Sequence, residues 1–123
     1  MDHWPRVWAG RSLLHAWHPL AEPAVLVGLS HDHWRVREMC AKVAAKQELG
    51  SAADLCSRAA AHDENSRVRV AALRVVGVSG EAEHAGGIRA LLADPRQDIA
   101  SAAELAWRKL DERLERPLTD DRL

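Results

Sequence analysis

The sequence contains no phenylalanine or tyrosine, and its five aromatic residues are all tryptophan. Strands are built mainly from β-branched and aromatic residues in alternation, so this shortage disfavours a β-sandwich. Hydrophobic residues nevertheless make up 47% of the 123 residues, and alanine is abundant among them. Small side chains at close spacing suit helices that pack tightly along their length. We therefore expect a single all-α domain over residues 1–123.

Long apolar runs and an excess of one charge are also missing. No run approaches the roughly 20 residues that a membrane-spanning helix needs, and the first residues lack the pattern of a signal peptide. The 17 basic and 18 acidic residues nearly cancel, so no overall field would attract nucleic acid. Two cysteines, Cys40 and Cys56, are too few for a disulfide framework. These absences predict a cytoplasmic protein that does not associate with membranes.

Motifs for catalysis or metal binding are absent as well. The sequence has no Gly-x-Ser-x-Gly, no phosphate-binding glycine loop and no His-Glu-x-x-His. Histidines do gather at His15-x-x-His18 and at His31-Asp-His33. Zinc needs three or four convergent ligands, and neither cysteine lies near these histidines, so we interpret them as capping and surface residues. We expect no catalytic activity, no cofactor and no metal.

One segment recurs along the chain at a spacing of 31 to 32 residues. Val36, Val68 and Ile99 occupy the same position in its three copies. After this position, apolar residues follow at i+3, i+4, i+7 and i+8, which places them on one face of an α-helix. The three copies begin at His31, Asp63 and Asp94. The sequence therefore predicts a repeat protein in which each copy contributes one long amphipathic helix.

Shorter apolar segments between the copies predict a second helix for each repeat. They fall at about 51–61 and 83–92, with Gly50 and Gly80 where the chain must reverse. The first third fits more loosely, with a helix expected from Trp4 to Trp17 and a short partner from Pro23 to Leu29. The total is about seven helices in three and a half repeats. The repeats are expected at about residues 1–30, 31–62, 63–93 and 94–116, with a frayed tail at 117–123.

Polar residues at the expected helix starts predict capping. Ser51 and Asp54 have the spacing of a capping box, and so do Asp63 and Ser66. In such a box the first side chain bonds a backbone N–H of the first turn. We therefore expect Ser51 and Asp63 to act as capping residues.

The repeated pattern resembles the HEAT-like repeats of the phycobilin-lyase type. The matching residues are Ala61-His-Asp63, Val68-Arg69, Ala71-Ala72 and Gly77 in one copy, and Leu92-Ala-Asp94, Ile99 and Ala102-Ala103 in the next. The resemblance covers about residues 20–110 and implies an α-α superhelix, a solenoid of the HEAT/armadillo kind. These repeats occur in scaffolds, adaptors and lyases, so the resemblance implies no single function. The last copy departs from it, because Ala100 stands where Arg is expected.

The resemblance also implies a role for two arginines one repeat apart. Arg37 and Arg69 resemble a ladder in which each arginine reaches an aspartate of a neighbouring repeat, such as Asp32 or Asp63. The alternative is a basic stripe that binds phosphate, formed together with Arg35 and Arg67. Because only two copies carry this arginine and the net charge is near zero, we favour the ladder and expect no nucleic-acid partner.

Two groups of residues are candidates for a protein partner. Trp34 and Arg35 begin a long helix where the other copies carry Ser66 and Gln97, so an interface hot spot is one interpretation. The other is that Trp34 packs on the first repeat. The second group is Trp4, Val7 and Leu14, which form a second apolar face on the first helix. This face could contact another copy of the chain or a partner, or be covered by the tail of the chain itself.

The short helices supply a third candidate surface. By resemblance they line the inner side of the superhelix, where their polar positions would contact a partner. These positions are Asp54, Ser57, Arg58, Glu83, His84 and Arg89. Their mixed signs favour a protein or peptide, with Arg58 and Arg89 as binding residues. We thus expect a non-catalytic interaction or scaffold module. The alternatives are an accessory subunit, a lyase-like enzyme of this repeat class, or nucleic-acid binding through Arg35, Arg37, Arg67 and Arg69.

Overall fold

The structure is a computed structural model that describes residues 17–114, and in this range it is all-helical with no strand. The α-helices are α2 (Glu22–Gly28), α3 (Trp34–Lys46), α4 (Ala53–His62), α5 (Ser66–Ser79), α6 (Ala85–Leu91) and α7 (Gln97–Arg113). Short 3-10 helices precede α2, α4 and α6, at Pro19–Ala21, Gly50–Ala52 and Ala82–His84. None of the helices between residues 17 and 114 has the length and apolarity needed to cross a bilayer. The all-α prediction is confirmed for these residues. The helix expected from Trp4 to Trp17 lies outside them, apart from Trp17.

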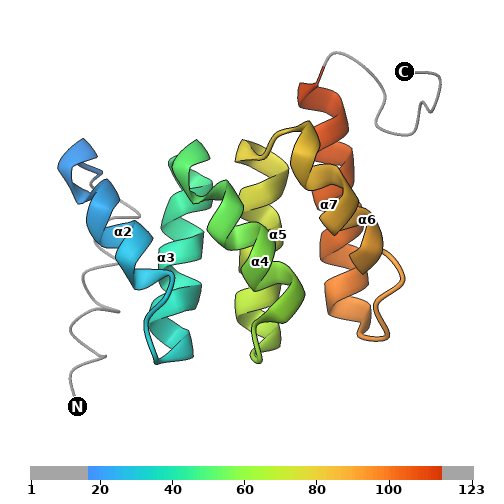
Figure 1. Cartoon of the computed structure of the whole chain (residues 1–123), viewed down its shortest axis with the longest axis horizontal. Helices are drawn as coiled ribbons and strands as arrows, with labels where there is room; N and C mark the ends of the chain where they lie inside the picture. The colour runs from blue at the N-terminus through green and yellow to red at the C-terminus, as the bar shows by residue number, and fades with distance from the viewer. Residues whose placement is uncertain (1–16, 115–123) are drawn as a thin grey trace.

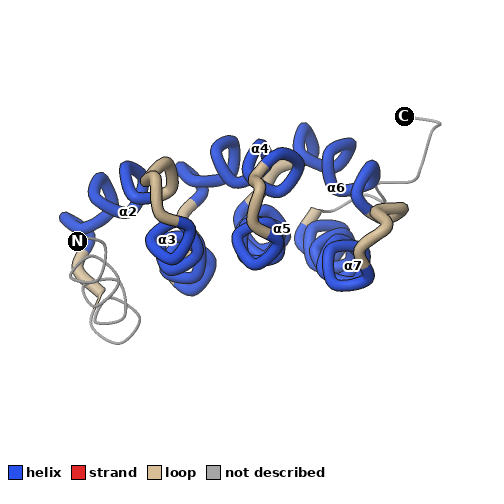
Figure 2. Tube along the Cα trace, turned by 90° about the horizontal axis from the view of Figure 1, so that it is seen from below, coloured by secondary structure: helices blue, strands red, loops and turns tan. Residues whose placement is uncertain are grey.

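The helices form two layers that follow chain order. The long helices α3, α5 and α7 make one layer, and the short helices α2, α4 and α6 make the other (Figures 1 and 2). Helix α5 contacts α3 on one side and α7 on the other, and each long helix also packs against the short helix that precedes it. Neighbouring hairpins therefore lie side by side in the order in which the chain makes them.

The two layers bow in one direction. Figure 2 shows the row of α2, α4 and α6 along the outer side of a shallow arc and α3, α5 and α7 along its inner side. The expectation that the short helices line the inner side is therefore wrong. The positions of Arg58 and Arg89 belong to the outer layer, since they lie on α4 and α6. We call the surface of α3, α5 and α7 that faces away from the short helices the inner face.

The core runs continuously between the two layers. Val36, Val68 and Ile99 are at most 2% exposed, and they occupy equivalent positions in the three long helices. The short helices contribute their own apolar residues, of which Val25, Cys56 and Ile88 are buried. Burial of a side chain of this size stabilises a fold by about 1.5–3 kcal/mol relative to leaving it exposed. The apolar periodicity read from the sequence thus identifies the face that each long helix buries.

The helix starts differ in detail from the capping boxes expected. Asp63 lies before the cap and accepts from the backbone N–H of Asn65, while Asn65 is the N-cap of α5 and accepts from Arg67 N–H. Ser51 does not cap α4, because its hydroxyl donates to Glu22 Oε2 at 2.6 Å and thereby links the starts of α2 and α4. After α3 the chain reverses at Glu48, whose φ of 51° is in the left-handed region, rather than at Gly50.

One close approach between two long helices depends on a glycine. A Cβ added at Gly77 of α5 would lie 2.9 Å from Cα of Ala106 in α7 and 3.3 Å from its carbonyl oxygen. These are backbone atoms, which cannot move without shifting α7. Gly77 therefore sets the distance between the second and third hairpins.

We predict that Gly77→Ala destabilises the fold by about 2 kcal/mol, because the added methyl group forces two packed helices apart. Gly86→Ala is the matched control. A Cβ at Gly86 of α6 meets no atom within 4 Å, so we expect that change to stabilise the protein by about 0.5 kcal/mol through the higher helix propensity of alanine. Urea unfolding followed by circular dichroism measures both. Equal midpoints for the two variants would contradict the proposed close approach.

Candidate functional site

The first ion pair of the long-helix layer joins neighbouring hairpins. Arg37 of α3 donates from Nε to Asp63 Oδ2 at 2.8 Å and from Nη2 to Asp63 Oδ1 at 3.0 Å. Its Nη1 also donates to the backbone carbonyls of His31 and Asp32, both at 2.9 Å. The Asp63 side chain is only 7% exposed and that of Arg37 12%. This bidentate pair closes the edge of the core between α3 and α5.

The same contact recurs one repeat later. Arg69 of α5 donates from Nη2 to Asp94 Oδ2 at 2.9 Å and from Nε to the carbonyl of Ala60 at 2.8 Å. Arg37–Asp63 and Arg69–Asp94 thus form an Arg–Asp ladder in which each arginine reaches the aspartate of the next repeat. The resemblance to HEAT-like repeats implied such contacts, and Asp63 was one of the two aspartates it suggested as acceptors. The side chain of Asp32 accepts from neither arginine, since Arg37 bonds only its backbone carbonyl.

The ladder has a pH-dependent component at Asp94. The backbone N–H of Arg96, and after it the guanidinium of Arg69, lower the pKa of Asp94 below its ordinary value of 3.8. A carboxyl group whose pKa is lower in the folded state stabilises the fold at pH values above its ordinary pKa. This stabilisation is lost as the pH falls through the lower, folded value. The Arg69–Asp94 contact is therefore fully present at neutral pH and weakens only in strong acid.

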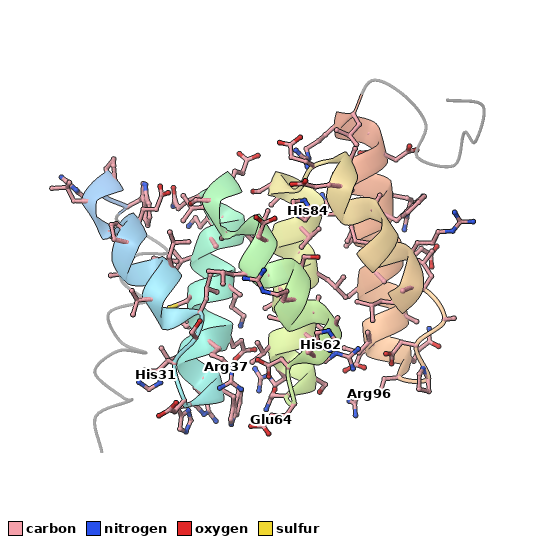
Figure 3. The ribbon with its side chains drawn as sticks, viewed as in Figure 1. His31, Arg37, His62, Glu64, His84 and Arg96 are labelled. Carbon is pink, nitrogen blue, oxygen red and sulfur yellow. The ribbon has the colours of Figure 1, made fainter. Side chains whose placement is uncertain are left out.

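The ladder removes two of the four arginines proposed for nucleic acid. Figure 3 shows Arg37 among His31, His62 and Glu64 at the edge where the long helices begin. Because Arg37 and Arg69 are bonded to buried or half-buried carboxylates, they cannot also neutralise phosphates without breaking the ladder. Of the four arginines proposed, only Arg35 and Arg67 stand outside the ladder, and Arg67 is itself paired with Glu38.

Trp34 has both of these arginines close to its ring. The guanidinium carbon of Arg35 lies 4.8 Å from the centre of the Trp34 ring, and that of Arg67 lies 5.4 Å from it. Arg67 also donates from Nε to Glu38 Oε2 at 3.1 Å, and His33 stacks on Trp34. Trp34 is half-buried, so the ring is partly covered by charged neighbours from its own and the next long helix. The candidate hot spot at Trp34 and Arg35 is thus a preformed cation–π cluster with limited free surface.

A groove of about 630 Å³ lies on the inner face. Its floor is apolar and comes from all three long helices, with Val70 and Val78 of α5 facing Leu105 of α7. Leu105 is 42% exposed, so part of its side chain lies open to solvent at the groove. The residues that line the groove are Ala45, Lys46, Val70, Arg74, Val78, Asp98, Ser101, Ala102, Leu105, Ala106 and Lys109.

Sequence reasoning missed this groove. Val70 and Leu105 fall outside the buried positions of each copy, so they were not assigned to the core or to a site. The available signal was an apolar residue on the polar side of an amphipathic helix, at two places in adjacent repeats. The sequence does not show that Val70 and Leu105 lie in one groove, because this depends on how the helices pack and on the direction in which the layers curve.

The outer layer has a polar cluster between α4 and α6. His84 is only 7% exposed, and its Nε2 lies 2.7 Å from Asp54 Oδ1 and 3.9 Å from Glu83 Oε1. These three residues are the group within the described range whose ligand atoms converge closely enough to hold a metal. The exposed residues Arg58 and Arg89 lie on the same two helices.

The hydrogen bonds of His84 argue against a metal there. Its Nδ1 accepts from the backbone N–H of Glu81 at 2.8 Å, so that nitrogen bears no proton and Nε2 donates to Asp54. A metal on Nε2 would require the proton on Nδ1, where it would face the Glu81 N–H. His84 therefore acts as a capping residue that joins α4 to the start of α6.

Other histidines also have capping roles. Nδ1 of His18, His31 and His33 accepts from the backbone N–H two residues further along the chain, at 3.0 to 3.1 Å. His31 occupies the position in its repeat that Asp63 occupies in the next one. The side chain of Asp63 likewise accepts from the backbone N–H two residues further on, that of Asn65. This agrees with the interpretation of the histidines as capping residues. His15, Trp4, Val7 and Leu14 lie outside the described residues.

The two cysteines have poorly reactive surroundings. Burial raises the pKa of the Cys40 thiol to about 11. For Cys56, burial and then the proximity of Cys40 raise the pKa to about 12. Nucleophilic attack needs the thiolate, which is scarce at neutral pH for both residues. Neither cysteine has the properties of a lyase nucleophile.

We predict that Arg37→Ala lowers the free energy of unfolding by about 3 kcal/mol, because it leaves the buried Asp63 carboxylate without its bidentate partner. Arg58→Ala is the control. Arg58 is exposed on α4, so its removal should change stability by less than about 0.5 kcal/mol. Chemical denaturation of both variants gives the comparison. A loss at Arg37 no larger than that at Arg58 would show that the ladder does not hold the hairpins together.

We further predict that a thiol reagent at about pH 8 labels the native protein roughly 100-fold more slowly than the urea-unfolded protein, since the raised pKa values remove the thiolate. Mass spectrometry of tryptic peptides separates Cys40 from Cys56. Cys56 should be the slower of the two. Rapid labelling of either thiol in the native protein would reopen the case for a lyase-like enzyme.

Comparison with known proteins adds no family to these observations. No protein-family model, no curated protein and no solved structure matches the chain. Any function is therefore inferred from the residues of the chain and their geometry.

Proposed function

We propose that the chain is a small HEAT-like solenoid that binds a protein partner through its inner face and does not itself catalyse a reaction. The observation that carries this proposal is the exposed apolar groove formed by α3, α5 and α7. The two-layer order of the hairpins and the Arg–Asp ladder support the repeat assignment, because both recur at the repeat spacing.

A binding role fits the groove better than catalysis does. Its lining contains no histidine, cysteine or glutamate, and its one carboxylate, Asp98, is hydrogen-bonded to Arg96 at 3.1 and 3.2 Å. An acid–base or nucleophilic mechanism would need a reactive group there. An apolar floor of this kind instead gains free energy by being covered. Action as an accessory subunit of a larger enzyme is compatible with this role.

The other candidate surfaces have less support. Arg58 and Arg89 lie in the outer layer among exposed polar groups, where ion pairs contribute little to affinity. Trp34 and Arg35 stand at the edge of the inner face and would extend a contact centred on the groove. Self-association through Trp4, Val7 and Leu14 remains a separate proposal. A cytoplasmic location is proposed from the sequence alone.

A photo-crosslinking residue in place of Leu105 tests this proposal. In extract from the native host, we expect the full-length protein to crosslink to one defined protein. The same residue in place of Leu92 is the control, because Leu92 has a similar exposure of 38% but terminates α6 in the outer layer. Equal products from both positions, or a product at Leu105 that nuclease removes, would contradict a protein-binding inner face.

A further inference from the structure

The inner face has regular rows because equivalent positions recur at the repeat spacing. Lys42 of α3 aligns with Arg74 of α5 and with Leu105 of α7. In the row one turn further along, Lys46, Val78 and Lys109 align in the same way. The groove lies around the apolar members of these rows, Val78 and Leu105, which have basic residues beside them.

The charges around the groove are mainly of one sign. Lys46, Arg74 and Lys109 are all exposed and line it, against the single carboxylate of Asp98. Asp98 is already paired with Arg96, which lowers its pKa and keeps it ionised. The next acidic residue of the inner face, Glu38, is only 8% exposed and is paired with Lys42 and Arg67. Basic side chains therefore outnumber carboxylates in the lining of the groove, and Arg74 and Lys109 place positive charge at its rim.

The apolar floor of the groove further limits which kinds of ligand fit it. A nucleic-acid backbone would use the cations but would leave Val70, Val78 and Leu105 without apolar partners. A ligand that satisfies both the floor and the rim must carry apolar side chains flanked by carboxylates. An amphipathic helix with acidic flanks has this combination, with its apolar residues three and four positions apart.

We infer that the inner groove binds an acidic amphipathic helix of a partner protein. The apolar side chains of that helix cover Val70, Val78 and Leu105, and its carboxylates pair with Arg74 and Lys109. This inference rests on the proposed protein-binding function and adds the chemistry of the partner. Charge complementarity of this kind also speeds association and excludes basic helices.

Two designed peptides of about 15 residues test the inference, since this length forms about four helical turns. Both carry leucine at the same helical spacing, but one has glutamate and the other lysine at the flanking positions. Fluorescence anisotropy with the full-length protein should show that the acidic peptide binds at least about tenfold more tightly than the basic one. Its affinity should fall as salt is raised, because the rim cations are exposed.

Matched variants locate the binding. Leu105→Glu should weaken the acidic peptide by about tenfold or more, because it places a carboxylate in the apolar floor. Leu92→Glu, with similar exposure in the outer layer, should leave binding unchanged. Arg74→Glu should weaken the acidic peptide and strengthen the basic one. The reversal at Arg74 also shows that the variant is folded.

Several results would overturn the inference. Equal affinity for the two peptides, or equal effects of Leu105→Glu and Leu92→Glu, would remove the acidic helix as the ligand. Binding of a DNA duplex that is lost in Arg74→Glu but kept in Leu105→Glu would assign the face to nucleic acid. A dimer in sedimentation that Leu105→Glu converts to monomer would assign it to a second copy. If a host protein still crosslinks at position 105 while the acidic peptide fails, the binding function stands and only the ligand chemistry is wrong.

Discussion

The packing of each long helix against the next is the constraint on which the rest of the structure depends. Helix α5 has α3 on one side and α7 on the other, and its contact with α7 is close enough that Gly77 lies against the backbone of Ala106. Val68 and Ile99 are at most 2% exposed in this arrangement, as is typical of repeats that bury their apolar faces against their neighbours. The Arg–Asp ladder closes the same interface at its edge, where the backbone carbonyls would otherwise be unsatisfied.

This packing also determines which residues are available for binding. Some positions that repeat at 31 to 32 residues face the short helices and are buried in the core. Other repeating positions face away from the short helices and form rows across the inner face. Lys42, Arg74 and Leu105 occupy one such row. The long helices lie on the inner side of the arc (Figure 2). Their solvent-facing residues therefore converge on one surface, where a single ligand can contact several helices. The residues of α4 and α6 lie on the outer side and diverge.

Much of the fold could be predicted from the sequence, because periodicity reports burial directly. The spacing of Val36, Val68 and Ile99 identified the long helices and their buried faces, and Asp63 was named as a ladder acceptor. Capping was predicted less well, since Asn65 and Asp63 compete for neighbouring N–H groups and Ser51 bonds Glu22 from another helix.

The candidate site could not be predicted, because it depends on how the layers curve. A small rotation between successive hairpins decides whether α4 and α6 or α5 and α7 line the inner side, and no residue encodes that rotation alone. Arg58 and Arg89, predicted to line the inner side, lie on α4 and α6 of the outer layer. Val70 and Leu105 are isolated apolar residues in the sequence, and only the packing of α5 against α7 places them in one groove.

Native-state hydrogen exchange, resolved by residue, tests most directly whether neighbouring hairpins hold one another in place. Helix α5 is covered by α3, α4 and α7, so its amides at Ala72 and Val76 should exchange only through global unfolding. Protection should fall toward α2 and α6, which have fewer neighbours. Equal protection in α2 and α5, or exchange of α5 by local opening, would contradict a core shared between successive hairpins.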